Sequence, residues 1–153
     1  MNPSLLICIL GFSPITEIRG SLLYWLAHPV IPFWQAFTLS FIFNLLPFFV
    51  VMFLFDGLVK FFIRYAWFER IWKKIVLNTR KKFEKYEKWE ELGLAIFIGV
   101  PFPLTGVWTG SLICFLLGWS VKKSFPYVLL GLTIASVIVS AVVLSGKTLF
   151  SLF

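Results

Sequence analysis

The chain has 153 residues, of which 59% are hydrophobic and 20% aromatic, and its mean hydropathy is +0.92. A soluble core of this size cannot hide 19 Phe and 7 Trp side chains, so the composition predicts an all-α integral membrane protein. The net charge of +7 does not indicate nucleic-acid binding, because ten of the fourteen basic residues fall in one segment, residues 60–88.

The first predicted element is apolar on both sides of a polar break, Gly11–Gly20. Pro14 fits the first position of a helix that Ser13 caps, and the first turns of this helix carry Glu17 and Arg19. A charge at bilayer depth costs roughly 2.5–3.5 kcal/mol, so it usually faces protein or a water-filled cavity. The alternative is a kinked spanning helix in which Glu17 and Arg19 only stabilise packing.

A turn at residues 28–32 follows, with Trp25 before it and Trp34 after it, as at a membrane interface. Its His28 is either a proton relay or a solvated loop residue. The next segment, 33–55, is long enough to span a bilayer. Asn44 and Pro47 within it need polar partners inside a helical bundle.

From Leu58 to Trp89 the pattern changes to that of an amphipathic helix with basic residues between apolar ones. The positive-inside rule places this segment in the cytoplasm, where it would lie on the anionic leaflet.

Residues 92–121 carry no charge, and as a single helix they would run about 45 Å, which exceeds the hydrocarbon thickness. The prolines, glycines and threonines of residues 99–110 predict a break near the middle. Lys122 and Lys123 then precede a final apolar helix, from about Phe125 to Leu144.

The sequence predicts a single membrane domain with a first half at 1–56, an amphipathic linker helix at 57–90 and a second half at 91–153. Gly20-Ser21-Leu22 in the first half matches Gly110-Ser111-Leu112 in the second. If both broken elements span the membrane, the halves are parallel repeats. If each is a re-entrant helical hairpin, the halves form an inverted-topology repeat that places Lys122 and Lys123 in the cytoplasm, which fits the positive-inside rule better.

Two re-entrant hairpins would meet tip to tip near the bilayer midplane, where helix N-termini offer free amide donors to an anion. Arg19 would bind a phosphate there, and Glu17 would couple proton movement to transport. The full set of candidate substrate-binding residues is Ser13, Thr16, Glu17, Arg19, Thr105, Gly106, Trp108 and Thr109. The alternative for the threonines and glycines is that they only allow close helix packing.

No catalytic set, cofactor motif or metal-ligand spacing is present in the sequence, so an enzyme is not expected. Cys8 and Cys114 lie in apolar runs and read as buried packing residues, with no disulfide implied.

The Glu17-x-Arg19-Gly20 motif, together with Pro101-x-Pro103 and Thr105-Gly106-x-Trp108-Thr109-Gly110, resembles the small multi-drug export proteins, a family related to the DedA/VTT (SNARE-associated) superfamily. The resemblance implies two re-entrant hairpins in inverted halves and a role in membrane transport. It also links acidic and arginine residues at the hairpins, here Glu17 and Arg19, to proton coupling and phosphate binding.

The leading functional hypothesis is a flippase for an anionic amphiphile such as a polyprenyl-phosphate-like lipid. The alternatives are a proton-coupled exporter of hydrophobic cationic drugs, against which the charge of Arg19 counts, and a non-transport membrane scaffold. We expect a multi-pass protein of the cytoplasmic membrane that forms a homodimer, since two spans and two half-depth hairpins shield their polar tips poorly.

Overall fold

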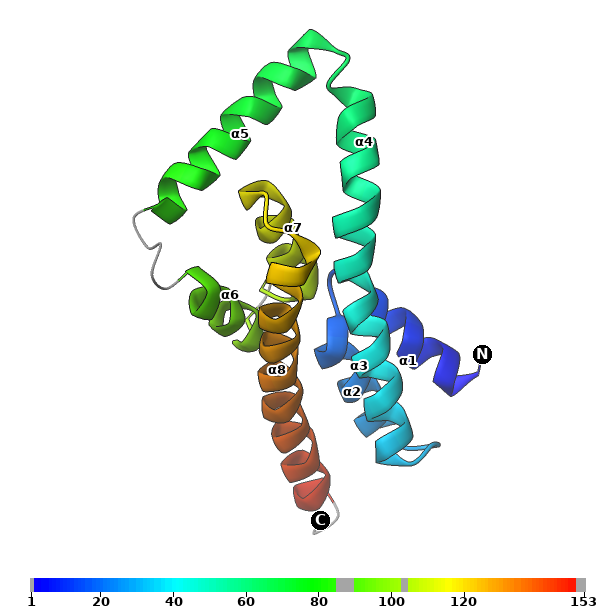
Figure 1. Cartoon of the computed structure of the whole chain (residues 1–153). Coiled ribbons are helices and arrows are strands. Elements are labelled where there is room, and N and C mark those ends of the chain that lie inside the picture. Colours follow the sequence, from blue (N-terminus) through cyan, green and yellow to red (C-terminus); the bar gives the residue numbers. More distant parts are fainter. Residues whose placement is uncertain (1, 85–89, 103–104, 151–153) are drawn as a thin grey trace.

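A computed structural model describes residues 2–84, 90–102 and 105–150, and all regular secondary structure in these ranges is helical (Figure 1). The helices in chain order are α1 Pro3–Phe12, α2 Glu17–Ala27, α3 Phe33–Phe49, the π-helix η1 Val50–Leu54, α4 Phe55–Phe62, α5 Ala66–Glu84, α6 Glu90–Gly99, α7 Val107–Leu117 and α8 Val121–Phe150.

Two helical stretches of the described chain are long and apolar enough to cross a membrane: Phe33–Phe62, made of α3, η1 and α4, and Val121–Thr148 in α8. The first extends beyond the predicted end at Phe55, because the helix continues through the π-helical turns of η1 that follow Pro47. A proline removes a main-chain donor, and an insertion of π-helix lets the chain continue without ending the helix. The second also exceeds its predicted bounds at both ends.

The predicted break in the second half is confirmed, since α6 ends at Gly99 and α7 begins at Val107. Helix α6 runs alongside α8 in the same direction, so that Glu91 contacts Lys123 and Gly99 packs against Ile134. Helix α7 then returns along α6, with Gly110 against Ile98. Ile134 is about 16 Å along α8 from Lys123 at 1.5 Å per residue, so the chain turns back roughly halfway along α8.

Glu91 fixes the open end of this hairpin. Its carboxylate accepts a hydrogen bond from Tyr127 Oη at 2.7 Å and lies 3.3 Å from Lys123 Nζ. Hydrogen bonds from the Tyr127 hydroxyl, which has the larger effect, and from the Lys123 ammonium lower the pKa of Glu91 below its ordinary value. Lys123 also lies over the Trp119 ring, 4.3 Å from its centroid.

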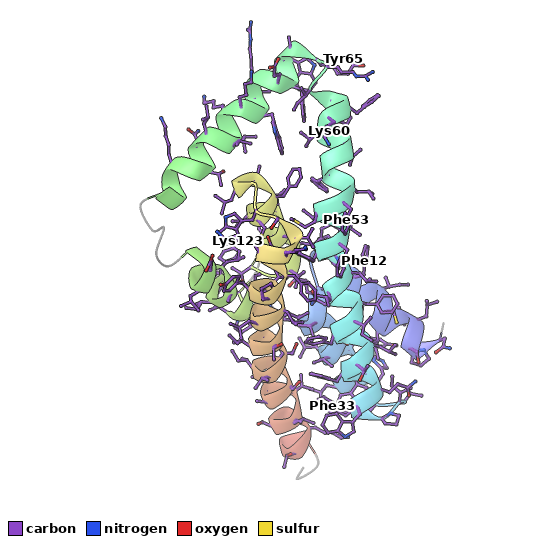
Figure 2. All side chains as sticks on the ribbon, viewed as in Figure 1. Phe12, Phe33, Phe53, Lys60, Tyr65 and Lys123 are labelled. Carbon is purple, nitrogen blue, oxygen red and sulfur yellow. The ribbon has the colours of Figure 1, made fainter. Side chains whose placement is uncertain are left out.

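In the first half, α1 packs on α3, where Gly11 lies against the backbone of Ser40. Helix α2 runs from the contact between α1 and α3 toward the end of the molecule where α8 finishes. There Lys147 Nζ lies 4.8 Å from the centroid of the Trp25 ring. Figure 2 shows Phe33 at this same end, whereas Lys60 and Tyr65 lie at the opposite end. The two broken segments therefore approach the middle of the molecule from opposite ends.

The start of α2 differs from the prediction. Ser13 ends α1 instead of capping α2, and residues 14–16 form a separate turn before the helix begins at Glu17. The physical reason is that Glu17 has a positive φ of 51°, which interrupts a helix that would otherwise start at Pro14.

The amphipathic helix also starts later than predicted, at Ala66, because the chain from Phe55 to Phe62 continues the membrane-length helix. The predicted end at Trp89 lies outside the described residues. Phe68 and Trp72 of α5 pack against Phe62 and Phe115, while neighbouring apolar side chains such as Trp67 are exposed. In Figure 1, α5 forms an arm that extends from the end of α4 across the molecule.

Candidate functional site

The candidate site lies where the tip of the first hairpin meets the tip of the second. Glu17 opens α2 and is only 6% exposed, which is rare for a carboxylic acid side chain. Its carboxylate faces the backbone N–H of Trp108, in the first turn of α7. A non-glycine residue with a positive φ is uncommon, and such strain concentrates at functional positions.

Arg19 lies two residues after Glu17 and binds the segment between α6 and α7. Its guanidinium donates to the carbonyl oxygens of Phe102, of Thr105 at 2.5 Å and of Val100 at 3.3 Å. The Thr105 hydroxyl lies 2.8 Å from both the Val100 and the Phe102 carbonyl and shares its one hydrogen between them, which closes the loop beside the arginine. This loop directly follows the end of α6.

The two charges are matched to the two ends of a broken helix. The carbonyls that receive Arg19 follow the C-terminus of α6, the negative end of its dipole, and the amide that faces Glu17 belongs to the N-terminus of α7, the positive end of its dipole. The carboxylate and the guanidinium also interact electrostatically with each other. We call this arrangement the hairpin latch: Glu17 and Arg19 of the first half bind main-chain groups of Val100, Phe102, Thr105 and Trp108 in the second half.

A further contact between the tips comes from Trp108, whose indole Nε1 donates to the Phe12 carbonyl at 2.8 Å. The two rings pack edge to face with centroids 5.5 Å apart. Trp108 thus satisfies a carbonyl at the end of α1.

Glycines permit this close approach. A Cβ added to Gly106 would overlap all three atoms of the Glu17 carboxylate, and one added to Gly20 would overlap the Thr16 side chain. The backbone of Gly106 is extended, with φ 165° and ψ −166°, so space rather than backbone strain requires glycine there.

Of the predicted site residues, the structure brings Glu17, Arg19, Thr105, Gly106 and Trp108 together. The remaining three are placed differently. The Ser13 hydroxyl lies 3.4 Å from the Ile15 amide, Thr16 donates to the Leu10 carbonyl at 2.7 Å, and Thr109 lies in the first turn of α7. Ser13 and Thr16 are therefore engaged within the turn of the first hairpin.

Two polar residues of α3 are buried without a partner among the described residues. The side chains of Ser40 and Asn44 are 0% exposed, and neither the Ser40 hydroxyl nor the two amide atoms of Asn44 form a hydrogen bond. The partner expected for Asn44 is therefore not found. Sequence reasoning also missed the Phe12, Val100 and Phe102 carbonyls, because main-chain acceptors leave no signature in a sequence.

No three His, Cys, Asp or Glu side chains of the described segments come close enough together to hold a metal ion.

These observations define the class: an all-helical membrane protein whose two halves each contribute a broken helical segment to a central polar contact. The chain belongs to the family described as "Putative small multi-drug export protein", whose model matches residues 17–138 and so includes both sides of the latch. No curated protein and no solved structure matches the chain. The relationship to the DedA/VTT superfamily stays a prediction.

Proposed function

We propose that this protein is a transporter of the cytoplasmic membrane in which both broken segments are re-entrant hairpins. Two contacts support this topology: the start of α6 touches the start of α8 at Glu91 and Lys123, and the end of α2 lies beside the end of α8 at Trp25 and Lys147. A hydrocarbon core is about 30 Å thick, so a turn about 16 Å along α8 lies near its middle. Transporters of inverted-repeat design bind substrate at this depth.

The hairpin latch is the proposed gate, and Glu17 is its proton acceptor. When Glu17 is ionised, its charge attracts the N-terminus of α7 and offsets the charge of Arg19. Protonation removes this attraction and leaves Arg19 holding the second tip alone. Uptake and release of one proton at Glu17 would therefore alternate the tips between a tight and a loosened contact.

The state of Arg19 bears on the substrate. A guanidinium grips a phosphate through one of two donor pairs, Nη1 with Nη2 or Nε with Nη2. Nη2 already donates to Thr105 and Val100, so neither pair is free. With its donors on backbone carbonyls, Arg19 repels a cation less than an unpaired guanidinium would. The geometry therefore supports export of hydrophobic small molecules, cations included, in line with the family's description.

One observation favours an anionic amphiphile such as a polyprenyl-phosphate-like lipid as the second candidate. Arg19 Nε is buried and has no acceptor among the described residues. A phosphate that displaced the Thr105 carbonyl would gain both Nε and Nη2. In that case the substrate itself opens the latch, and its phosphate, by binding Arg19, changes the charge that Glu17 faces.

The proposal also includes that the protein transports its substrate as a homodimer and catalyses no reaction. Side chains of α1 and α3 such as Leu5, Ile9 and Ile42 are about half exposed, so this face has apolar surface available for lipid or a second copy.

The test is transport in proteoliposomes with an imposed pH gradient, using wild type, Glu17→Gln and Arg19→Lys. One set of vesicles receives a hydrophobic cationic dye and another a fluorescent polyprenyl phosphate. For the first candidate, Glu17→Gln removes the pH dependence of dye export, and Arg19→Lys weakens the latch without creating phosphate transport. For the second, lipid movement depends on Arg19 and dye export is absent.

Glu69→Gln is the matched control, since Glu69 is a partly exposed carboxylate of α5 that pairs with Lys73 far from the latch. We expect Glu69→Gln to leave both dye export and lipid movement unchanged. Full pH dependence in Glu17→Gln would contradict the proposed role of the carboxylate, and absence of movement of both substrates in wild type would contradict transport.

A further inference from the structure

An open groove between α1 and α3 has a volume of about 400 Å³, within the roughly 300–1,000 Å³ range of ligand pockets. Six side chains of the two helices line it: Leu5, Cys8, Ile9, Phe12, Phe43 and Leu46. We call it the α1–α3 groove. Leu5, Ile9 and Leu46 are exposed, so the groove opens at the outer surface of these helices.

The α1–α3 groove lies at mid-depth of the molecule. Phe43 is ten residues after the start of α3 at Phe33, which is about 15 Å along the helix at 1.5 Å per residue. Figure 2 likewise shows Phe12 between the end of the molecule marked by Phe33 and the end marked by Lys60. Half of a hydrocarbon core is also about 15 Å, so the groove opens toward acyl chains and away from water and headgroups.

The lining of the groove suits an uncharged occupant. None of its six side chains is charged, and a charge at bilayer depth without a polar partner is unfavourable. Phe12 and Phe43 present aromatic rings from opposite walls, and such rings pair favourably with the ring of a ligand. The groove is therefore complementary to an apolar molecule that carries an aromatic ring.

Phe12 joins the groove to the hairpin latch. It lines the groove, and its ring also packs edge to face on Trp108, with centroids 5.5 Å apart. The main-chain amide of Trp108 in turn faces the Glu17 carboxylate. The helices α1 and α3 are in close contact at Gly11, where an added Cβ would lie 3.2 Å from the Ser40 carbonyl oxygen, so the groove does not pass between them there. A molecule in the groove is thus separated from the second tip by the Phe12 side chain.

We propose that the α1–α3 groove takes up an uncharged hydrophobic small molecule with an aromatic ring from the surrounding bilayer and holds it beside the latch. This rests on the proposed function, since it gives the exporter an entrance for its substrate. When the tips separate, Trp108 moves away from Phe12, and the freed Phe12 ring can turn aside. The groove and the polar contact between the tips then become continuous.

The experiment is photo-labelling of the full chain in proteoliposomes with an uncharged aromatic diazirine, followed by peptide mapping. Only the labelling that an excess of the non-photoreactive analogue removes is counted, because lipid-facing side chains also react without binding. We expect this labelling on residues 5–12 and 43–46. Ile9→Trp and Leu46→Trp fill the groove from opposite walls, so each should lower it about fivefold or more, the factor that corresponds to overpacking an apolar site.

Ile96→Trp is the matched control. Ile9 and Ile96 are 50% and 60% exposed, and each lies in a helix of a predicted hairpin, but Ile96 belongs to α6 and does not line the groove. The control should therefore keep the labelling of the wild-type chain.

Export of the same compound from these vesicles separates this inference from the proposed function. If wild type exports the compound and both filled variants export it at the wild-type rate, the groove is not the entrance, although the transport proposal stands. If the groove is labelled and wild type exports nothing, the binding site stands and the transport proposal fails.

Two other occupants would overturn the inference. One is an acyl chain, shown by a photoreactive phosphatidylcholine that labels the same residues and is not displaced by the compound. The other is a second copy of the chain, shown by a dimer that Ile9→Trp dissociates. Labelling that Ile9→Trp and Leu46→Trp leave undiminished would also overturn it.

Discussion

Gly106→Ala tests the hairpin latch most directly. The new methyl group would overlap the Glu17 carboxylate, which must then leave the backbone amide of Trp108. A hydrogen bond to a charged group contributes about 1.5–3 kcal/mol. For a chain of this size each kcal/mol shifts Tm by about 2–4 °C, so we expect Tm to fall by roughly 3–12 °C. The extended backbone of Gly106 accepts alanine, so no backbone strain adds to this loss.

The assay is thermal unfolding in mild detergent, followed by tryptophan fluorescence, with Gly93→Ala as the matched control. Gly93 lies in α6 of the same hairpin, and a Cβ there meets no atom within 4 Å. Alanine inside a helix is more stable than glycine by about 0.5–1 kcal/mol, so this control should raise Tm. The two substitutions are chemically identical and should shift Tm in opposite directions.

A double-mutant cycle isolates the contact. In Glu17→Ala the space beside Gly106 is empty, so adding Gly106→Ala should cause little further loss. If the effects of Glu17→Ala and Gly106→Ala simply add, or if Gly106→Ala raises Tm as Gly93→Ala does, the carboxylate does not lie against Gly106 and the latch is wrong.

Three further predictions concern stability. Tyr127 and Lys123 lower the pKa of Glu91, so the ionised Glu91 stabilises the folded state. This contribution is present above the ordinary glutamate pKa of about 4.3 and is lost as pH falls through the lowered pKa. Glu91→Gln should therefore remove this acid-dependent part of the Tm profile, and an unchanged profile would contradict the reasoning. Asn44→Leu replaces an unpartnered buried amide and should stabilise by about 1–3 kcal/mol in thermal unfolding, whereas a loss would reveal a bound partner. Trp108→Phe keeps an aromatic ring but leaves the Phe12 carbonyl unpaired, so unfolding should show a loss of about 1–3 kcal/mol, and no change would mean that water replaces the indole.

The helical fold follows from features that a sequence displays. Proline and glycine at residues 99–110 marked the break between α6 and α7, and unbroken apolar runs marked the two long helices. The exact bounds did not follow, because η1 lets the chain pass Pro47 and carries the helix to Phe62. A π-helical insertion depends on packing around it and has no reliable local signal.

The charged pair in the candidate site was also evident, since Glu17 and Arg19 stand out in an apolar chain. Their partners were not, because both charges bind main-chain groups of the other half. Sequence reasoning assigned Arg19 to a substrate phosphate, a role that stays a prediction, whereas the structure shows its Nη atoms on carbonyls. Only the three-dimensional contact also shows why position 106 requires glycine.

The latch has a consequence for how the chain is made. The carbonyls that bind Arg19 lie 81 to 86 residues further along the sequence. When the first hairpin leaves the ribosome, its carboxylate and guanidinium therefore have each other but none of their main-chain partners, and burying them in lipid is unfavourable. The first hairpin should remain at the translocon or the bilayer surface until the second half has been synthesised, so a chain that ends before Val100 should insert α3 but leave Arg19 accessible to water.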